Sequence, residues 1–268
     1  MKKITELMNL ENRKALVTGG AGHIGLIICE TLLELGATVT LTDMDETACH
    51  EKCISLNKQG YKGHAIPLAA DLADINDTKQ VVINAANKMG GLNILIHSAA
   101  FVGTTKYPGW TVPFENQTIE AWDAAMRVNL TAAFLLIQTA KPYLEESKNA
   151  SIIMIDSIYG LLGPDFRIYK ETNITTPAAY AASKGGLLQL CRYLATLLAP
   201  HIRVNAITAG GIWRGQPELF CQRYCEKTPL KRMATEEDFK GGIAYLASDL
   251  SAYVTGQNLI IDGGWTAW

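Results

Sequence analysis

Tyr180 and Lys184 are the residues of this 268-residue chain whose types and spacing best suit proton transfer. They stand four positions apart, so a helix would place both side chains on one face. A phenol with its ordinary pKa of about 10 is a poor proton shuttle near neutral pH, but an ammonium beside it favours the phenolate. The pair can therefore act as an acid and base. The spacing alone is weak evidence, because the same two residues also occur four apart on solvated helix faces.

A glycine-rich segment near the start of the chain strengthens this interpretation. The apolar run 14–17 leads into TGGAGHIG over residues 18–25, and a helical pattern follows. A strand, a glycine-rich turn and a helix N-terminus form an anion site that accepts the diphosphate of a dinucleotide. We therefore expect dinucleotide contacts from Gly19, Gly22, His23, Ile24 and Gly25.

Asp43 follows the next apolar run, 37–42, and stands eighteen residues after Gly25. A carboxylate at the end of that strand can accept hydrogen bonds from the adenosine ribose hydroxyls, and it would repel a 2′-phosphate. No Arg or Lys lies in the glycine turn or directly after Asp43. The sequence therefore favours NAD over NADP as the cofactor.

The composition of the chain suits one globular domain over residues 1–268. Hydrophobic residues make up 48% and charged residues 19%, which describes an ordinary core with a polar shell. The net charge of −2 and the pI of about 6.2 argue against a nucleic-acid groove or a polybasic membrane surface. No segment has the length of a membrane span or the apolar core of a signal peptide. We expect a cytoplasmic protein that binds neither nucleic acid nor membrane.

The six cysteines do not indicate a disulfide framework or a zinc site. They are scattered at positions 29, 49, 53, 191, 221 and 225 of a long chain. Two pairs of them have a four-residue step, whereas common zinc sites use the shorter C-x-x-C spacing. We expect reduced thiols and no bound metal.

Strands alternate with helices along the chain, which predicts an α/β fold with a parallel sheet covered on both faces. Several strand candidates are apolar throughout, as strands buried on two sides should be. The predicted strands cover residues 15–18, 38–42, 64–67, 94–97, 151–155, 203–207 and 258–261. The predicted helices cover residues 22–35, 46–59, 78–89, 119–141, 178–198 and 236–247.

Taken in order, these features resemble the short-chain dehydrogenase/reductase family over essentially the whole chain. The matching positions are the glycine turn 18–25, Asp71, Asn129, Ser157, Tyr180-x-x-x-Lys184 and Asp262-Gly263-Gly264. The resemblance implies a single-domain Rossmann fold with a doubly wound, seven-stranded parallel sheet and helices on both faces. A narrower likeness is to the dehydrogenases of bacterial flagellin-glycan and nonulosonate sugar pathways.

The resemblance also implies roles for the matching residues. Tyr180 would donate or accept the proton, and Ser157 would hold the substrate oxygen. Lys184 would lower the pKa of the tyrosine and bind the nicotinamide ribose, and Asn129 would support a water relay to Lys184. Read singly, Asn129, Ser157 and Asp71 also suit ordinary capping roles. The implied cofactor residues outside the glycine turn are Asp43, Asp71, Leu72, Ser98, Ala99, Tyr180, Lys184, Gly210 and Ile212.

The chain departs from the family pattern at three places. His23 stands where glycine is usual, so its side chain must point away from the phosphates or hydrogen-bond one of them. The segment HSAA over residues 97–100 replaces the usual two asparagines, alanine and glycine, and Ala209-Gly210 replaces a proline and glycine. Cofactor binding should survive all three. The Gly19, Gly22, Gly25 spacing is also typical of sugar-nucleotide epimerases.

Two polar loops should choose the substrate. Residues 164–173 form an insertion between Ser157 and Tyr180, and residues 211–218 follow the sixth strand. Both loops are too polar for a lipid or steroid. Three cations in these loops can bind a phosphate or carboxylate, and they are Arg167, Lys170 and Arg214. Two aromatic residues, Tyr169 and Trp213, can cover the face of a sugar. The alternative is that all five are solvated loop residues.

The leading hypothesis is an NAD-dependent oxidoreductase that interconverts a secondary alcohol and a ketone on a polar, sugar-type substrate. The alternative is a sugar or sugar-nucleotide epimerase or dehydratase that retains NAD through its cycle. Family members commonly assemble through two long helices, here 119–141 and 178–198, so the resemblance implies a homo-oligomer, a tetramer or a dimer. The apolar residues 264–268 would pack at an interface of this kind.

Overall fold

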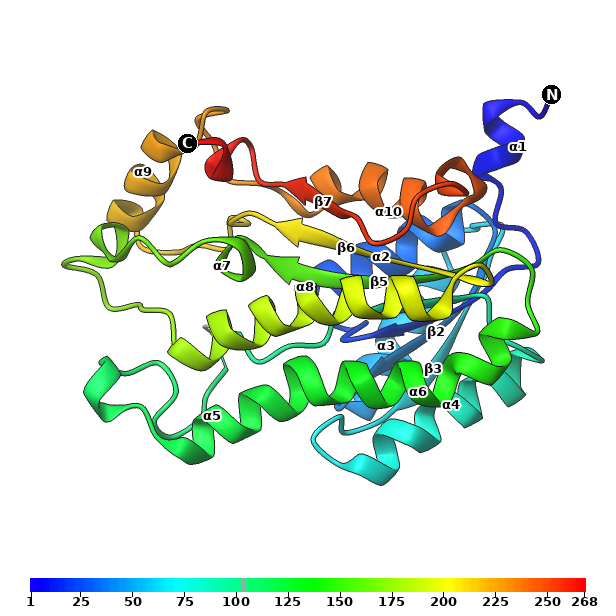
Figure 1. Ribbon diagram of the computed structural model, residues 1–268, viewed down its shortest axis with the longest axis horizontal. Helices are drawn as coiled ribbons and strands as arrows, with labels where there is room; N and C mark the ends of the chain where they lie inside the picture. Colours follow the sequence, from blue (N-terminus) through cyan, green and yellow to red (C-terminus); the bar gives the residue numbers. More distant parts are fainter. Residues whose placement is uncertain (103–104) are drawn as a thin grey trace.

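A computed structural model describes residues 1–102 and 105–268 and shows one parallel sheet between two layers of helices (Figure 1). The strand order is β3-β2-β1-β4-β5-β6-β7, which reverses between β1 and β4 as in doubly wound sheets. The predicted fold class is confirmed. The strands are β1 Lys14–Thr18, β2 Thr38–Asp43, β3 His64–Ala69, β4 Ile94–His97, β5 Ala150–Ser157, β6 Ile202–Ala209 and β7 Asn258–Ile261.

Helices cover both faces of the sheet because its central strands are apolar on both sides. In β5, Ile152 and Met154 belong to the core formed with α4, α6 and α8, whereas Ile153 and Ile155 belong to the core formed with α2, α3 and α10. Only a strand between two helix layers can bury both sets. The helices are α1 Ile4–Met8, α2 His23–Glu34, α3 Glu46–Asn57, α4 Ile75–Met89, α5 Ile119–Met126, α6 Ala132–Glu145, α7 Ile158–Leu161, α8 Ala178–Leu198, α9 Glu218–Lys227 and α10 Lys240–Ala247.

Besides the two short helices α1 and α7, which the sequence does not predict, three helical regions differ from the prediction. The single helix expected over 119–141 is in fact two helices, α5 and α6, joined by a π-helical turn, Arg127–Thr131. Apolar residues recur on both sides of this turn, so the sequence pattern does not reveal it. The region 236–247 opens with a 3-10 turn, Glu236–Phe239, before α10 begins. The sequence does not predict α9, because this helix is mostly polar and charged and buries only Phe220 and Tyr224.

A small apolar cluster outside the sheet joins the insertion to α9 and the C-terminus. It contains Ile168 of the insertion, Phe220 and Tyr224 of α9, and Trp265. The rings of Tyr224 and Trp265 stack with their centroids 4.2 Å apart. Trp265 is therefore buried within its own subunit, which corrects the expectation that it packs at an interface. The ring of Trp268 remains exposed in the single chain.

Within residues 1–102 and 105–268, no helix is long and apolar enough to cross a membrane. In the same part of the chain, no three His, Cys, Asp or Glu side chains gather where they could hold a metal ion. All six cysteines are free thiols, and four of them are buried in the two cores beside the sheet.

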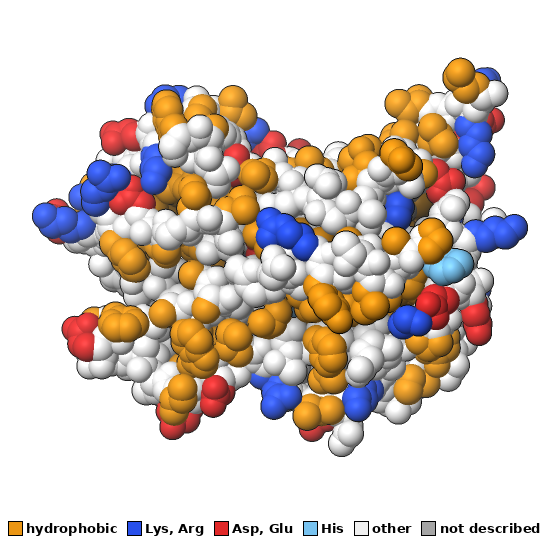
Figure 2. All heavy atoms as spheres, viewed as in Figure 1, with side chains coloured by type: hydrophobic (Ala, Val, Ile, Leu, Met, Phe, Trp, Pro, Cys, Tyr) orange, Lys and Arg blue, Asp and Glu red, His pale blue; other side chains and the backbone are white. Residues whose placement is uncertain are grey.

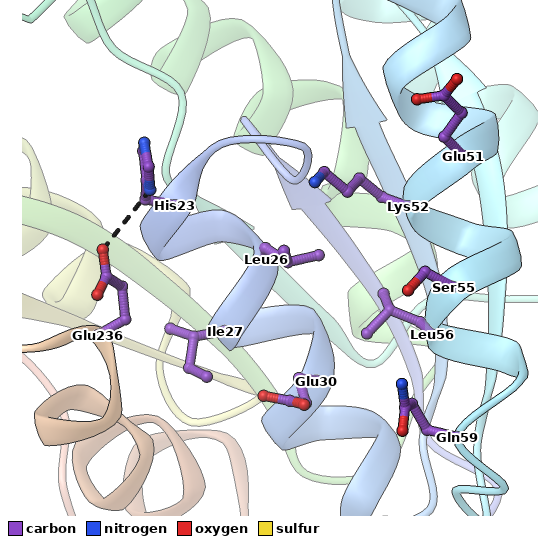
Figure 3. Close-up of a pocket in the computed structure, with 10 residues that line it drawn as sticks. All are labelled: His23, Leu26, Ile27, Glu30, Glu51, Lys52, Ser55, Leu56, Gln59 and Glu236. Atoms are coloured by element: carbon purple, nitrogen blue, oxygen red, sulfur yellow. Dashed lines mark ion pairs between the residues drawn. The ribbon is translucent and has the colours of Figure 1, made fainter.

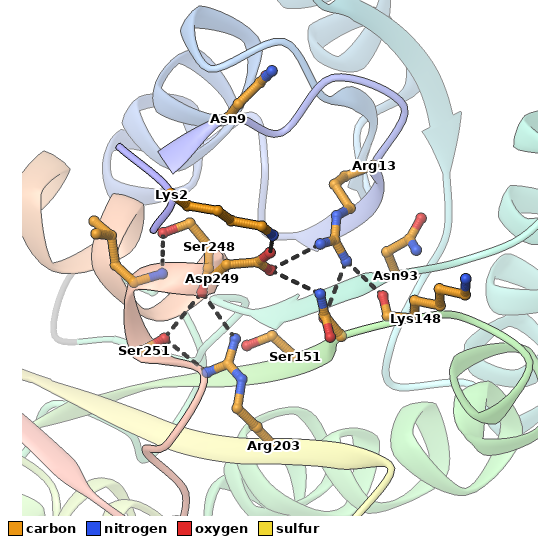
Figure 4. A network of polar contacts seen from close by, with 12 residues as sticks. Lys2, Asn9, Arg13, Asn93, Lys148, Ser151, Arg203, Ser248, Asp249 and Ser251 are labelled. Carbon is orange, nitrogen blue, oxygen red and sulfur yellow. Dashed lines mark hydrogen bonds and ion pairs between the residues drawn. The ribbon is translucent and has the colours of Figure 1, made fainter. Parts of the chain in front are cut away.

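Two arginines tie the amino-terminal edge of the sheet to the 3-10 turn that follows α10 (Figure 4). Arg13 donates from Nη2 to Asp249 Oδ1 at 2.9 Å. Arg203, at the start of β6, donates from Nη2 to the carbonyl oxygens of Leu246 and Ser248 at 3.1 and 3.2 Å. Because these residues precede or begin their strands, the network lies at the end of the sheet opposite the carboxyl end of β5.

Replacing Arg203 by Met should lower the free energy of unfolding by about 1–3 kcal/mol, because partly buried acceptors would lose a charged donor. These acceptors include the Ser251 hydroxyl, which Arg203 Nη1 reaches at 2.8 Å. Urea unfolding followed by circular dichroism would measure the change. Arg192→Met, at an exposed position of α8, is the control and should change stability by less than about 0.5 kcal/mol. Equal losses in both variants would contradict the structural role of the network.

Candidate functional site

Ser157, Tyr180 and Lys184 come together where β5 ends beside α8. Ser157 is the last residue of β5, and the other two lie in the first two turns of α8, whose bounds match the predicted helix. Lys184 is buried, and its Nζ donates to the carbonyl oxygen of Ile155 at 2.8 Å. The same Nζ lies 5.8 Å from the centroid of the Tyr180 ring. The helix therefore places the phenol and the ammonium on one face, as their spacing predicts.

Burial governs the acid–base properties of this pair. It raises the pKa of Tyr180 above its ordinary value; a hydrogen bond with Ser157 opposes the rise, and the charge of Asp156 adds to it. Burial lowers the pKa of Lys184, and Asp156 partly offsets that change. The family resemblance implies that Lys184 lowers the pKa of the tyrosine. In this structure, desolvation of the phenol outweighs any such effect.

The hydroxyl of Ser157 makes the cap that the sequence allows, and it also lies beside Tyr180. Its Oγ accepts a hydrogen bond from the backbone N–H of Tyr159 at 3.2 Å, which caps α7. It also makes the hydrogen bond with Tyr180 that opposes the rise in the pKa of the phenol. The cap fixes the hydroxyl at the end of β5, beside the group that can exchange a proton.

Asn129 is fully buried in the π-helical turn, where one extra residue turns its side chain toward α8. Its Oδ1 accepts from the backbone N–H of Phe101 at 2.6 Å, and its Nδ2 donates to Ser183 Oγ at 2.9 Å. These bonds hold the loop after β4 against the first half of α8. The amide is hydrogen-bonded to Ser183, the neighbour of Lys184, and to the loop backbone.

His97 takes over the structural task of the asparagine that usually stands at its position. Burial lowers the pKa of His97 to about 3, so the ring is neutral at physiological pH. Its Nε2 lies 3.3 Å from the carbonyl oxygen of Asn129 and must carry the proton, which leaves Nδ1 to accept from Thr18 Oγ1 at 3.0 Å. The ring therefore links β1, β4 and the π-helical turn.

The glycine turn packs so closely against itself and the loop after β4 that two of its positions have no space for a side chain. A Cβ on Gly25 would lie 1.9 Å from the carbonyl oxygen of Gly19, and one on Gly19 would lie 2.7 Å from Ala99 Cα. Gly19 also has a φ of +65°, which suits glycine. No side chain caps α2, so its first backbone N–H groups can bind an anion. These features fit a dinucleotide diphosphate, as the motif predicts.

Asp43 and Asp71 both lie at the carboxyl edge of the sheet, with different contacts. Asp43 ends β2, and its two carboxylate oxygens accept from the backbone N–H groups of Ala21 and Met44 at 3.3 and 2.9 Å. Asp71 is exposed and caps a turn by accepting from Ala73 N–H at 2.8 Å, so its ordinary capping role is present. Leu72 is buried in the core beside α4.

The remaining cofactor candidates also lie at this edge of the sheet. The backbone N–H groups of Ser98 and Ala99 donate to Thr18 Oγ1 at 3.2 and 3.3 Å, which joins the loop after β4 to β1. A Cβ on Gly210 would lie 2.7 Å from Asp262 Cα, so β6 and the segment after β7 can approach only with glycine here. Ile212 is buried and pairs with Ala234 in an isolated parallel bridge.

His23 is directed at Glu236, which is one of the two orientations that its position allows. Figure 3 shows its ring directed at Glu236, with Nδ1 3.6 Å from Oε1. Arg214 Nε lies 3.5 Å from the same oxygen. The cavity in Figure 3 has a volume of about 450 Å³ and lies between α2 and α3; none of its lining residues belongs to the Ser157, Tyr180 and Lys184 group.

The candidate residues of the two predicted substrate loops have different surroundings. Tyr169 packs against Phe220, with ring centroids 5.3 Å apart. Arg167 makes a two-pronged pair with Asp165, and Lys170 stays exposed. Arg214 is close enough to Tyr180 to lower the pKa of the phenol, and the Trp213 ring is exposed beside it. Of the five candidates, Arg214 is the one whose charge acts on Tyr180.

Two residues of the site region escape the sequence motifs. Asp156 is a buried carboxyl directly before Ser157, and the signal for it is a charged residue at the end of an otherwise apolar strand. Glu236 faces both His23 and Arg214, residues far from it in sequence, so no local pattern reveals it.

The chain matches the family model described as enoyl-(acyl carrier protein) reductase over residues 19–266. It is 33% identical over 264 residues to the 3-oxoacyl-[acyl-carrier-protein] reductase FabG of Thermotoga maritima, covering 96% of this chain and 99% of the relative. It is 32% identical over 270 residues to the probable galactose dehydrogenase GalD of Rhizobium meliloti, covering 97% of both. A flagellin-related protein is also among the relatives. The post-translational flagellin modification protein A of Campylobacter coli is 27% identical over 258 residues, covering 96% of this chain and 99% of the relative.

Two solved structures show the same fold with a nucleotide. A short chain dehydrogenase from Leptospira borgpetersenii, described with bound NAD+, is 34% identical with a TM-score of 0.83, covering 99% of this chain and 96% of that one. A relative from Beutenbergia cavernae, described with bound NADP at low occupancy, is 28% identical with a TM-score of 0.85, covering 98% and 100%.

The enzymes named among these relatives are dehydrogenases and reductases, so they lend no support to the epimerase or dehydratase alternative. The match extends from the glycine turn to the C-terminal segment and includes the residues around Tyr180. The chain belongs to the short-chain dehydrogenase/reductase family, a family of NAD(P)-binding oxidoreductases that act on CH–OH groups.

Proposed function

We propose that this chain is an NAD-dependent dehydrogenase that interconverts a secondary alcohol and a ketone on a polar, sugar-type substrate. The observation that carries the proposal is the placement of Ser157, Tyr180 and Lys184 at the carboxyl end of β5. In doubly wound sheets, ligands bind at this edge, beside the glycine turn between β1 and α2.

Each side chain has a distinct task in the proposed reaction. When bound, the nicotinamide supplies the chemistry of hydride acceptance or donation. Tyr180 takes the hydroxyl proton as the alcohol becomes a ketone, and it returns a proton in the reverse direction. Ser157 hydrogen-bonds the same oxygen atom and steadies the charge that develops on it. Lys184 supplies a buried positive charge beside the phenol, and Asn129 holds the loop and helix that frame the pair.

Asp43 supports NAD as the cofactor in this proposal. Its carboxylate ends β2 and contacts the glycine turn through the backbone N–H of Ala21. In a Rossmann fold this is the position that hydrogen-bonds the ribose hydroxyls of NAD, and its charge repels the 2′-phosphate of NADP. Met44, the next residue, supplies no positive charge to offset that repulsion.

The polar loop after β6 supports a sugar-type substrate. Arg214 can pair with an anionic group and Trp213 can stack on a sugar ring, as cations and aromatic faces often do in binding sites. The relatives named a probable galactose dehydrogenase and a flagellin modification protein are consistent with this substrate class. The acyl-carrier reductase among the relatives makes a thioester the competing class.

We also propose that the chain assembles as a homo-oligomer, a tetramer or a dimer, through α5, α6 and α8. Figure 2 shows hydrophobic side chains gathered over these helices. Large apolar residues on them are exposed in the single chain: Ile119, Trp122, Phe134, Tyr193 and Leu197. An apolar surface of this kind favours association. Light scattering of the purified protein would show a monomer if the proposal is wrong.

A substrate panel tests the proposed function directly. The near-ultraviolet absorbance of NADH would be followed with NAD, and separately with NADP, against sugar alcohols, amino sugars, sugar phosphates and nucleotide sugars, with a 3-hydroxyacyl thioester as the competing class. NADH formed with one sugar class is the expected result. Turnover only with the thioester would overturn the sugar assignment, and turnover only with NADP would overturn the cofactor assignment.

Tyr180→Phe should lower turnover about a hundred- to ten-thousand-fold, because the ring stays in place while its exchangeable proton is lost. Binding of NADH, followed by its fluorescence, should stay within about threefold of the unchanged chain. Tyr253→Phe, at a fully exposed tyrosine, is the matched control and should keep full activity. Turnover retained by Tyr180→Phe would remove Tyr180 from the proposed mechanism.

Asp43→Asn should change the cofactor preference, because it removes the charge and preserves the shape of the side chain. The ratio of the NADP and NAD dissociation constants should fall by about tenfold or more, which corresponds to about 1.4 kcal/mol. Fluorescence titration with NADH and NADPH measures both constants. Glu51→Gln, an exposed charge removal on α3, should leave the ratio unchanged. An unchanged ratio in Asp43→Asn would show that Asp43 does not select the cofactor.

A further inference from the structure

Asp156 is a buried carboxyl that the proposed reaction leaves without a task. It stands directly before Ser157 in β5 and is only 2% exposed. Its register partner in β6 is Thr208. The backbone of α7 closes over it, since a Cβ on Gly160 would lie 2.6 Å from Asp156 Oδ2. A carboxylate in such a position has lost nearly all of its hydration. The protein must therefore stabilise its negative charge with donors or cations, or the carboxylate becomes protonated.

The protein offers few hydrogen-bond donors to Asp156. Thr208 Oγ1 lies 3.1 Å from Asp156 Oδ2, and Asp156 Oδ1 has no hydrogen-bond partner. The Thr208 hydroxyl also lies 2.9 Å from Asn258 Oδ1, and a hydroxyl has one proton to donate. The hydroxyl can therefore donate to only one of these two oxygens at a time, which leaves the Asp156 carboxylate poorly supplied with donors.

The charged and titratable groups that interact electrostatically with Asp156 come from α8, which the bond from Lys184 Nζ to the carbonyl oxygen of Ile155, at 2.8 Å, holds against this end of β5. They are Tyr180, Lys184 and Cys191, while β6 contributes only the neutral Thr208 hydroxyl. Among the residues that the structure describes, no cation forms an ion pair with Asp156 within 4.0 Å. Burial raises the pKa of Asp156 to about 6, and the charge of Lys184 opposes that rise.

We propose that Asp156 is a positioning residue for proton transfer, whose buried charge controls how firmly Tyr180 and Lys184 hold their protons. The inference rests on the proposed roles of these two residues. A negative charge behind Ser157 makes a phenolate harder to form and an ammonium easier to keep. An ionised Asp156 therefore favours the phenol, which is the form that donates a proton to a ketone oxygen. A neutral Asp156 releases this constraint and makes the phenolate, the form that oxidation needs, easier to reach.

The pH profile of alcohol oxidation tests this assignment. In Asp156→Asn the shape is kept and the charge is lost, so the pKa of Tyr180 should fall. The limb of log kcat/KM that rises with pH should move to lower pH by about half a unit or more. Asp123→Asn, an exposed charge removal on α5, should leave the limb unmoved. A folded, active Asp156→Asn chain with an unmoved limb would overturn the inference.

Thr208→Val is a second variant that retains the carboxyl group. It removes a side-chain hydrogen-bond donor to Asp156, so it should raise the pKa of Asp156 further and keep this group neutral to higher pH. The limb should then move in the same direction as in Asp156→Asn, by a smaller amount. A shift to higher pH in Thr208→Val would contradict the inference.

Thermal unfolding at several pH values reports on Asp156 without using activity. Its folded pKa of about 6 exceeds the ordinary 3.8, so the folded chain binds this proton more tightly than the unfolded chain. Ionisation therefore costs stability as pH rises from about 4 to about 6, and the full cost remains above that range. Asp156→Asn should melt at a higher temperature than the unchanged chain at pH 7.5, and the gap should shrink toward pH 4.5.

The two kinds of measurement separate the possible failures. If Tyr180→Phe keeps its activity, the proposed function fails, while the pH-dependent melting gap still reports a buried, titrating Asp156. If the melting gap is the same at both pH values, Asp156 does not titrate in the folded chain, and the further inference fails while the proposed function stands.

Discussion

The hydrogen bond from Lys184 Nζ to the carbonyl oxygen of Ile155 is the contact on which the candidate site depends. An ammonium that is almost fully buried requires a partner, and a carbonyl held in a sheet ladder is a rigid one. The bond fixes the first turns of α8 against the end of β5. Tyr180, one turn before Lys184, is thereby held beside Ser157. Desolvation that comes with this packing then shifts the pKa values of both groups away from their ordinary values.

A chain of polar contacts behind the site connects α8 to the strand that leads into the glycine turn. It runs from Thr18 through His97 and the backbone of Asn129, and then from the Asn129 side chain to Ser183. Ser183 Oγ donates in turn to the carbonyl oxygen of Tyr180 at 2.8 Å. All its links are made by buried or partly buried groups, where an unmade hydrogen bond would be costly. The position of the phenol is therefore tied to the position of the turn that fits a dinucleotide.

Much of this fold and site can be predicted from the sequence because the signals are local. The period of apolar residues identifies the strands and α8, and the glycine turn and the Tyr180 and Lys184 spacing are short motifs. The π-helical turn at Asn129, the helix α9 and the packing of Tyr169 and Trp265 depend on tertiary contacts that no local pattern carries. The pKa of Tyr180 cannot be predicted locally either, because it depends on desolvation by several packed elements. The Tyr180 and Lys184 motif indicates only that a positive charge is near the phenol.

The two loops that flank the site differ in how they are held: the insertion packs against α9, whereas the loop after β6 carries Arg214 in an ion pair. The insertion is fastened to α9 by the aromatic cluster and by Lys227, whose Nζ lies 3.1 Å from Asp165. Arg214 instead pairs with Glu236 at 3.5 Å and also acts on the phenol of Tyr180. A negatively charged substrate that drew Arg214 toward itself would bring its own charge near Tyr180 and offset the effect of the guanidinium on the phenol. Under the proposed function, substrate charge and proton transfer would be coupled through Arg214, whereas the insertion is held in place by its contacts with α9.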